Sequence, residues 1–101
     1  MLLERTKYRK LMEDFFSQNG EEELQNWKNF IFEKDNNGKL GLVWGSVLYG
    51  RLGAEVRNWM RQQAPWIDEE FKNFGDNWYC EFEDYSWGIF KEIVDYWKAA
   101  K

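Results

Sequence analysis

Large apolar side chains recur every three or four residues along most of this chain, the spacing of one face of an α-helix. Residues 2–18 show the pattern first, and Asn-Gly at 19–20 supplies a stop signal. A second helix is predicted after the three glutamates at 21–23, whose charge suits the positive N-terminal end of a helix. The Asp-Asn-Asn-Gly stretch at 35–38 then predicts a turn, because Asn and Gly tolerate positive φ.

A third helix is predicted over 42–63, with Gly45 and Gly53 near its apolar face. A glycine inside a helix costs up to about 1 kcal/mol relative to alanine. Two glycines on the buried side therefore predict close approach by another helix. Pro65 ends this helix at or before Ala64, because a residue that precedes proline disfavours the helical conformation.

The last third of the chain is predicted to hold two more helical segments. Residues 66–75 form a short helix that a glycine closes, and residues 76–83 form an irregular stretch. The final helix covers 85–99, with Asp84 or Ser86 as its N-cap. Strand signals are weak throughout.

The predicted fold is all-α, a compact single-domain bundle of four to five helices over residues 1–101. A chain of 101 residues is long enough for one core and too short for two. Its 44% hydrophobic and 20% aromatic content excludes a disordered chain, which lacks the apolar surface that offsets the entropy of ordering.

Residues for catalysis or metal binding are scarce. The chain has no histidine, the commonest general base near neutral pH and a common metal ligand. Cys80 lies beside Glu81 and near Glu83, whose negative charge disfavours a thiolate. Residues 33–40 match the first half of a calcium loop, but its twelfth position is Trp44 in place of the bidentate glutamate. We therefore expect no catalytic residues, no metal and no cofactor, and a protein that is not an enzyme.

Charge and cysteine content indicate the compartment and the kind of partner. A single cysteine cannot form an internal disulfide, and the N-terminus is charged within five residues, unlike a signal peptide. No apolar run is long enough to span a bilayer, so we expect a cytoplasmic protein without membrane contact. A pI near 4.9 disfavours direct binding to nucleic acid and favours a basic protein partner, or no partner at all.

Two short motifs resemble a signature of small uncharacterised bacterial domains. In these domains a helix that reads L-G-x-x-[IV]-R-N precedes an acidic D-x-S-x-x-I helix start. The chain departs from the signature at Tyr49 and Arg51, where His and Gly are expected, and in the aromatic-rich insert between the motifs. The resemblance covers about half the chain and implies a fold without an established activity. Its matching residues are Leu52, Gly53, Val56, Arg57 and Asn58, then Asp84, Ser86 and Ile89.

Arg57 connects these two motifs in the interpretation that we favour. An ion pair between Arg57 and Asp84 would tie the third helix to the last one, because a guanidinium can bind a carboxylate in a bidentate manner. The alternative makes Arg57 and Asn58 a ligand-binding pair.

Acidic and aromatic side chains alternate near the carboxyl end of the chain. Residues 62–101 hold nine carboxylates against four lysines, a net charge of −5, whereas residues 1–61 carry +1. Interfaces favour Trp and Tyr as contact residues, with surrounding charge that steers the encounter. The alternative is an ordinary core with a solvated acidic face. The predicted partner-binding residues are Asp76, Trp78, Tyr79, Glu81, Glu83, Asp84 and Tyr85.

These observations favour a non-enzymatic acidic interaction protein. The leading hypothesis is a bacterial or phage inhibitor, of the immunity, antitoxin or anti-defence type, that binds a basic protein such as a nuclease toxin or a nucleic-acid-guided effector. The second is a self-associating structural or regulatory subunit, so the chain is expected as a monomer or a homodimer. The third is a small-molecule sensor with a Trp-lined pocket in which Arg57 binds an anion.

Overall fold

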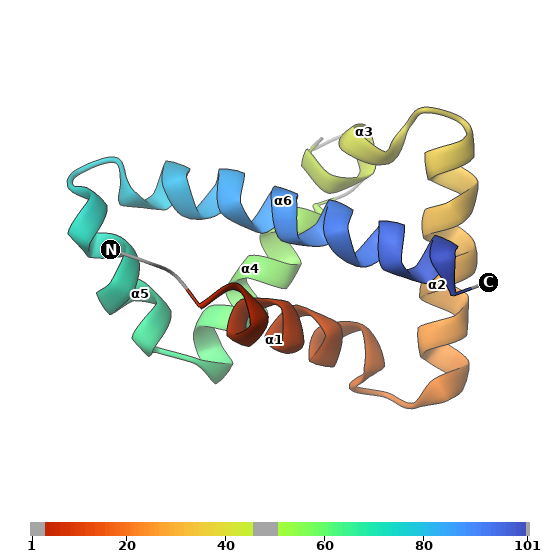
Figure 1. Ribbon diagram of the computed structural model, residues 1–101, viewed down its shortest axis with the longest axis horizontal. Coiled ribbons are helices and arrows are strands. Elements are labelled where there is room, and N and C mark those ends of the chain that lie inside the picture. Colours follow the sequence, from red (N-terminus) through yellow and green to blue (C-terminus); the bar gives the residue numbers. More distant parts are fainter. Residues whose placement is uncertain (1–3, 46–50, 101) are drawn as a thin grey trace.

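The computed structural model describes residues 4–45 and 51–100. Within them the fold is all-α, without a strand, as the periodicity predicts. The number of helices is six, where four to five are predicted, and a single 3-10 turn follows the fifth (Figure 1). The elements are α1 (Arg5–Ser17), α2 (Glu21–Asn36), α3 (Leu40–Gly45), α4 (Leu52–Gln63), α5 (Trp66–Phe71), η1 (Lys72–Phe74) and α6 (Trp78–Ala99).

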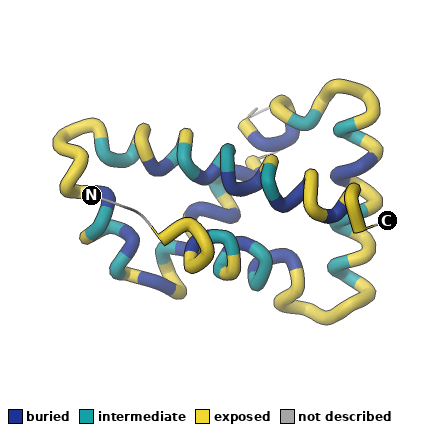
Figure 2. Tube along the Cα trace, in the orientation of Figure 1, coloured by how far each residue is buried: buried dark blue, intermediate teal, exposed yellow. Residues whose placement is uncertain are grey.

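The helix α6 organises the fold. It crosses the long dimension of a molecule measuring 37 × 27 × 22 Å, with α5 near its first turn and α2 near its last (Figure 1). Both α1 and α4 pack against it. Buried residues line the sides of these helices that face one another, and exposed residues face outward (Figure 2). The largest fully buried side chains are aromatic: Tyr8, Phe16, Phe71, Phe82 and Phe90.

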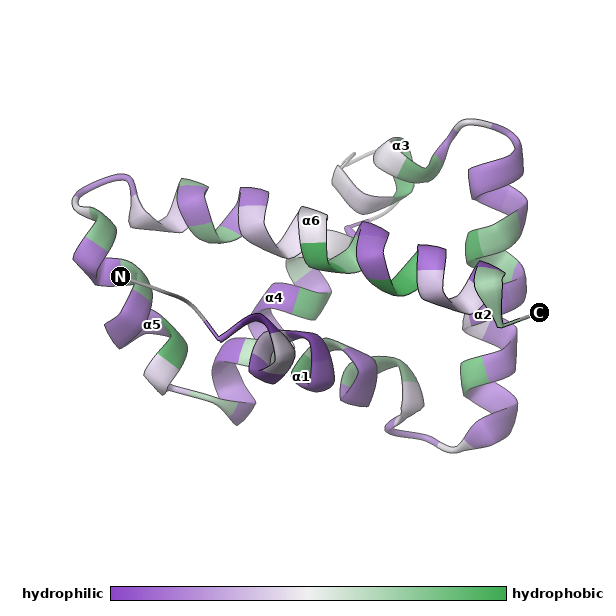
Figure 3. Ribbon diagram, viewed as in Figure 1, coloured by the Kyte–Doolittle hydropathy of each residue, from purple (hydrophilic) through white to green (hydrophobic). Residues whose placement is uncertain are grey.

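The prediction of an irregular stretch over 76–83 is wrong beyond its first two residues. α6 begins at Trp78 and runs unbroken for 22 residues. Asp84 and Ser86 therefore lie inside the helix and do not cap it, and the N-cap position belongs to Asn77. Hydrophobic and hydrophilic residues alternate along the whole of α6, as the period of a helix with one buried face requires (Figure 3).

The prediction of one helix over 42–63 is also wrong. α3 ends at Gly45 and α4 begins at Leu52, while Arg51 has φ −130° and ψ 33°. Along one continuous helix, Trp44 and Gly53 would lie about 13 Å apart, at 1.5 Å per residue. In the fold they are in direct contact, so α3 and α4 are not parts of one straight helix. Tyr49, one of the departures from the bacterial signature, lies outside the described residues.

The predicted turns and stops are found. Gly38 has φ +69° and donates its N–H to the Asp35 carbonyl oxygen. α4 ends at Gln63, two residues before Pro65. η1 is followed by Gly75, whose φ of +93° suits a residue without a Cβ. These positions end helices through local backbone chemistry, which explains why they could be predicted.

Candidate functional site

The outward side of α6 carries three exposed carboxylates together with the exposed Lys91. Glu81, Asp84 and Asp95 are exposed, and at 100° per residue they fall within about 60° of one another around the helix. Asp76 is exposed just before the helix begins. Within residues 4–45 and 51–100, none of these four carboxylates has an ion-pair partner. We call Asp76, Glu81, Asp84 and Asp95 the acidic face.

The predicted aromatic residues lie on other sides of α6. Trp78, Tyr79 and Tyr85 are half-buried and pack against the core. The Tyr85 ring meets the ring of Tyr8 edge-on, with centroids 5.1 Å apart, and burial raises the Tyr85 pKa. Phe82, next to Glu81 and Glu83 in sequence, is fully buried. The fold thus separates the rings from most of the acids, although the two alternate along the sequence.

Arg61 links α4 to α5 and α6. Its Nε and Nη2 donate hydrogen bonds of 2.7 and 2.9 Å to the two carboxylate oxygens of Asp68. The guanidinium also lies over the rings of Trp78 and Tyr79, at 5.6 and 5.4 Å from their centroids. The hydrogen bond from Arg61 lowers the pKa of Asp68. Two charge-assisted bonds and two ring contacts make this an architectural clamp.

Arg57 lies one turn earlier on α4 and is only 8% exposed. Its Nη1 donates a long 3.4 Å hydrogen bond to Ser86 Oγ, and its Nη2 lies 3.7 Å from Glu83 Oε2. Nε is buried without a hydrogen-bond partner. The predicted pair with Asp84 is therefore wrong, because Glu83 is the carboxylate that faces α4 while Asp84 points outward. Asn58, the alternative ligand partner, is exposed.

Gly53 brings α3 close to Arg57. A Cβ at this position would lie 2.7 Å from the Trp44 carbonyl oxygen and 2.9 Å from Arg57 Nη1. Only a glycine fits at that separation, so the predicted close approach of a helix is confirmed at Gly53. It is not found at Gly45, which is exposed and where a Cβ would meet no atom of the described residues within 4 Å.

A cavity of about 360 Å³ opens beside this contact, and Arg57 forms part of its wall. Arg51 and the indoles of Trp44 and Trp87 line it as well. Sequence reasoning missed these three residues. The signal available was the spacing of Trp87 and Phe90 on α6, which places the indole next to the buried side of the helix.

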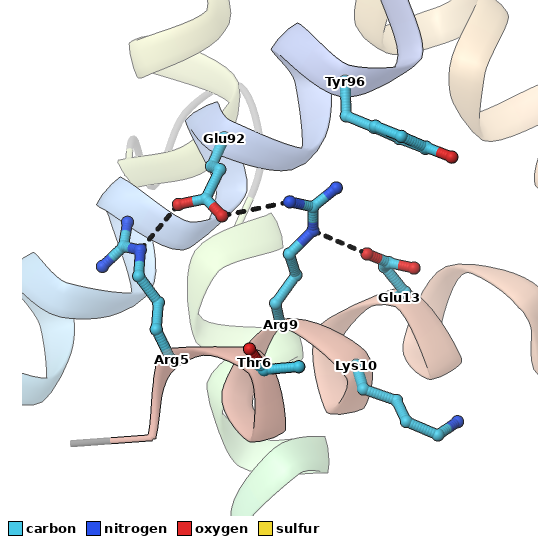
Figure 4. A pocket seen from close by; sticks show the side chains of 7 residues that line it. All are labelled: Arg5, Thr6, Arg9, Lys10, Glu13, Glu92 and Tyr96. Carbon is cyan, nitrogen blue, oxygen red and sulfur yellow. Dashed lines mark hydrogen bonds and ion pairs between the residues drawn. The ribbon is translucent and has the colours of Figure 1, made fainter. Parts of the chain in front are cut away.

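Another cavity, of about 570 Å³, lies between α1 and α6 and is shown in Figure 4. Glu92 occupies its centre and accepts hydrogen bonds from Arg5 Nε at 2.6 Å and Arg9 Nη1 at 3.1 Å. Arg9 also binds Glu13 and lies over the Tyr96 ring (Figure 4). The hydrogen bond from Arg5 lowers the pKa of Glu92. Because these arginines are already paired, the cleft joins two helices and offers a ligand little free charge.

Comparison with known proteins gives no relative: no protein-family model, no curated protein and no solved structure matches the chain. The resemblance to small bacterial domains therefore stays a prediction. Across the described helices, none has both the length and the apolar character needed to cross a membrane. Nor do three or more Cys, Asp or Glu side chains of the described segments converge as metal ligands would.

Proposed function

We propose that this chain is a non-enzymatic interaction protein that binds a basic protein partner through the acidic face of α6. The class that fits best is an inhibitor of the immunity, antitoxin or phage anti-defence type. Its partner would be an enzyme with a cationic cleft, such as a nuclease toxin or a nucleic-acid-guided effector. Carboxylates on the inhibitor then take the place of the phosphates that such a cleft binds.

The observation that carries the proposal is the unpaired charge of the acidic face. About half of the cations in the described ranges pair with acids elsewhere, among them Arg5 with Glu92, Arg61 with Asp68, and Lys98 with Asp35. The four carboxylates of the acidic face are exposed and have no ion-pair partner among the described residues, so their field extends into solvent. Such a field raises the association rate with a basic partner and weakens as salt screens it.

The half-buried rings of the predicted partner-binding segment have a supporting role in this proposal. Trp78 and Tyr79 follow Asp76 closely in sequence and keep part of their surfaces accessible. Their inner surfaces are fixed by the core and by Arg61, which presents them with little entropy left to lose on binding. Glu83 and Tyr85 face other parts of the fold and are secondary in this proposal.

The test is a pair of charge-reversal variants with equal net charge. Glu81→Lys/Asp95→Lys reverses two charges on the acidic face, and Glu33→Lys/Glu69→Lys reverses two exposed charges elsewhere. Either change takes the net charge from −4 to 0. Immobilised wild-type chain should capture a basic protein from a lysate of the source organism, and capture should weaken with salt.

Glu81→Lys/Asp95→Lys should capture at least about tenfold less of that protein, while Glu33→Lys/Glu69→Lys captures as much as the wild type. Equal capture by both variants, or capture of no basic protein by the wild type, would reject the proposal.

A second candidate, self-association, rests on a different surface. Phe30 and Leu42 are 38% and 48% exposed and line a cavity of about 220 Å³ between α2 and α3. Sedimentation velocity at micromolar concentration separates the two candidates. A dimer that Leu42→Glu dissociates supports self-association, and a clean monomer rejects it.

A further inference from the structure

The buried guanidinium of Arg57 has more hydrogen-bond donors than the described part of the fold satisfies. Arginine carries five N–H donors, and burying them without partners is costly. Among the described residues, hydrogen bonding accounts for one of them, the 3.4 Å bond to Ser86 Oγ. Glu83 contributes charge at 3.7 Å, a separation too long for a good hydrogen bond. A cation held in this way has capacity for an anionic group.

The cavity beside Arg57 has flat apolar walls. Trp44 is buried, and its ring stacks on Phe90 with centroids 4.3 Å apart, so its position is fixed by the core. Trp87 lies 5.9 Å from Trp44 at an interplanar angle of 44°. Ala54 adds a small side chain to the wall and leaves the space open. At this spacing the two indoles contact each other and form one apolar wall, against which a planar ring can lie.

The charges around the cavity select the kind of anion. Arg57 and Arg51 contribute two positive charges, and Glu83 and Asp84 contribute two negative ones. A dianion such as phosphate would face both carboxylates and be repelled. A monocarboxylate matches the planar fork of a guanidinium and adds one negative charge, which the exposed Arg51 can balance. A volume near 360 Å³ lies within the range of small-molecule sites.

We infer that this cavity binds a small aromatic monocarboxylate, with its carboxylate on Arg57 and its ring against Trp44 and Trp87. The cavity borders the acidic face at Asp84, but the inference rests on Arg57 and the two indoles and does not depend on the proposed function. Gly53 supports the site, because it allows Trp44 and Arg57 to lie against each other.

The experiment titrates the chain with 1-naphthoate and follows the side-chain Nε–H signals of the arginines by NMR. The neutral 1-naphthamide is the matched probe. The Arg57 signal is assigned by its absence from the spectrum of Arg57→Lys, a variant that keeps the positive charge and loses the planar guanidinium. Arg61→Lys makes the same change one turn further along α4, outside the cavity. Ala54→Leu fills the cavity and keeps every charge.

The expected result is a shift of the Arg57 signal with naphthoate and binding of naphthamide at least about tenfold weaker. Arg57→Lys and Ala54→Leu should each weaken naphthoate binding by about tenfold, and Arg61→Lys should leave it within about twofold. If Arg57→Lys does not fold, naphthoate binding by Ala54→Leu tests the inference, and undiminished binding by that variant would overturn it. Equal binding of the two probes, or no response up to about 10 mM naphthoate, would overturn the inference.

Discussion

Arg57 and Arg61 lie one turn apart on α4, and their surroundings differ in one decisive respect. Arg61 is partly exposed, yet it makes two short hydrogen bonds to Asp68 and contacts two aromatic rings. Arg57 is more deeply buried and has one long hydrogen bond and a distant carboxylate. Burial alone would suggest that Arg57 is the structural residue of the two. The number of satisfied N–H donors leads to the opposite conclusion: Arg61 is the structural residue, and Arg57 is the one free to bind a ligand.

The comparison teaches that pairing separates an architectural arginine from a binding one. A guanidinium whose donors are satisfied stabilises the helices it joins and has little left for a ligand. A buried guanidinium with unused donors destabilises the isolated fold and gains more from a bound anion. Substitutions at and around the two arginines can break or sharpen this distinction.

The largest effect is expected from Gly53→Ala. The new Cβ would lie 2.7 Å from the Trp44 carbonyl oxygen, a backbone atom that cannot rotate away. Overpacking of this kind should lower the free energy of unfolding by about 2–3 kcal/mol, despite the better helix propensity of alanine. Urea denaturation measures the change. A variant as stable as the wild type would show that α3 and α4 tolerate separation and that the position of Arg57 is not fixed by their contact.

Replacing each arginine by methionine compares the two sites directly. Arg61→Met removes both hydrogen bonds to Asp68 and should cost about 2 kcal/mol. Arg57→Met removes a poorly paired buried cation and should change stability by less than about 1 kcal/mol in either direction. Thermal and chemical unfolding of the two variants, measured side by side, give the difference. A larger loss at Arg57 than at Arg61 would contradict the distinction.

The pH dependence of stability isolates the Arg61 clamp. Because Arg61 lowers the pKa of Asp68 in the folded chain, Asp68 stabilises the fold above its ordinary pKa, and this contribution is lost as the pH falls through the lowered value. Asp68→Asn should therefore cost about 1 kcal/mol at neutral pH, and its stability should converge with that of the wild type between about pH 5 and pH 2.

Glu69→Gln is the matched control for that experiment. Glu69 is adjacent and exposed, with no ion-pair partner in the described part of the chain. Substitution of Glu69 should leave the loss of stability at acid pH the same as in the wild type. An Asp68→Asn curve parallel to that of the wild type at every pH would mean that the clamp contributes no pH-dependent stability.

The smallest effect, and the only gain, is expected from Gly88→Ala. Gly88 lies within α6, and a Cβ there would meet Arg5 Nη2 at 3.5 Å, an ordinary contact. Alanine should stabilise the helix by about 0.5–1 kcal/mol. Differential scanning calorimetry detects such a change as a higher Tm. A loss of stability in Gly53→Ala together with a gain in Gly88→Ala would confirm that the close approach of α3, and not helix propensity, determines the requirement for glycine at position 53.

The start of α6 shows where sequence reasoning stopped short. Trp78, Tyr79 and Phe82 continue the spacing of Ile89 and Phe90 toward the N-terminus, so the helical period was present in the sequence. Acids interleave with the rings over this segment and obscure the periodicity, which suggested an irregular stretch. The aromatic residues also have lower helix propensity than alanine, by several tenths of a kcal/mol each. Burying one such ring contributes about 1.5–3 kcal/mol, so tertiary packing outweighs the local preference.

The candidate site was less predictable than the fold. The sequence indicated that Arg57 faces an acidic part of the last helix, and it does. Adjacent residues of a helix point 100° apart, so the rotation of α6 against α4 decided that Glu83 and not Asp84 is its neighbour. The cavity wall combines residues of α3, α4 and α6. The spacing of residues within one helix does not predict which residues of three helices come into contact.

The sequence by itself determined the helical class, the ends of helices at glycine and proline, and the excess of negative charge toward the carboxyl end. These properties depend on backbone preference and on composition, which act over a few residues. The tertiary structure decided which arginine is satisfied, which rings are turned inward and where a cavity remains. These depend on side chains up to 87 residues apart, as with Arg5 and Glu92, and only the packing of the helices brings such side chains together.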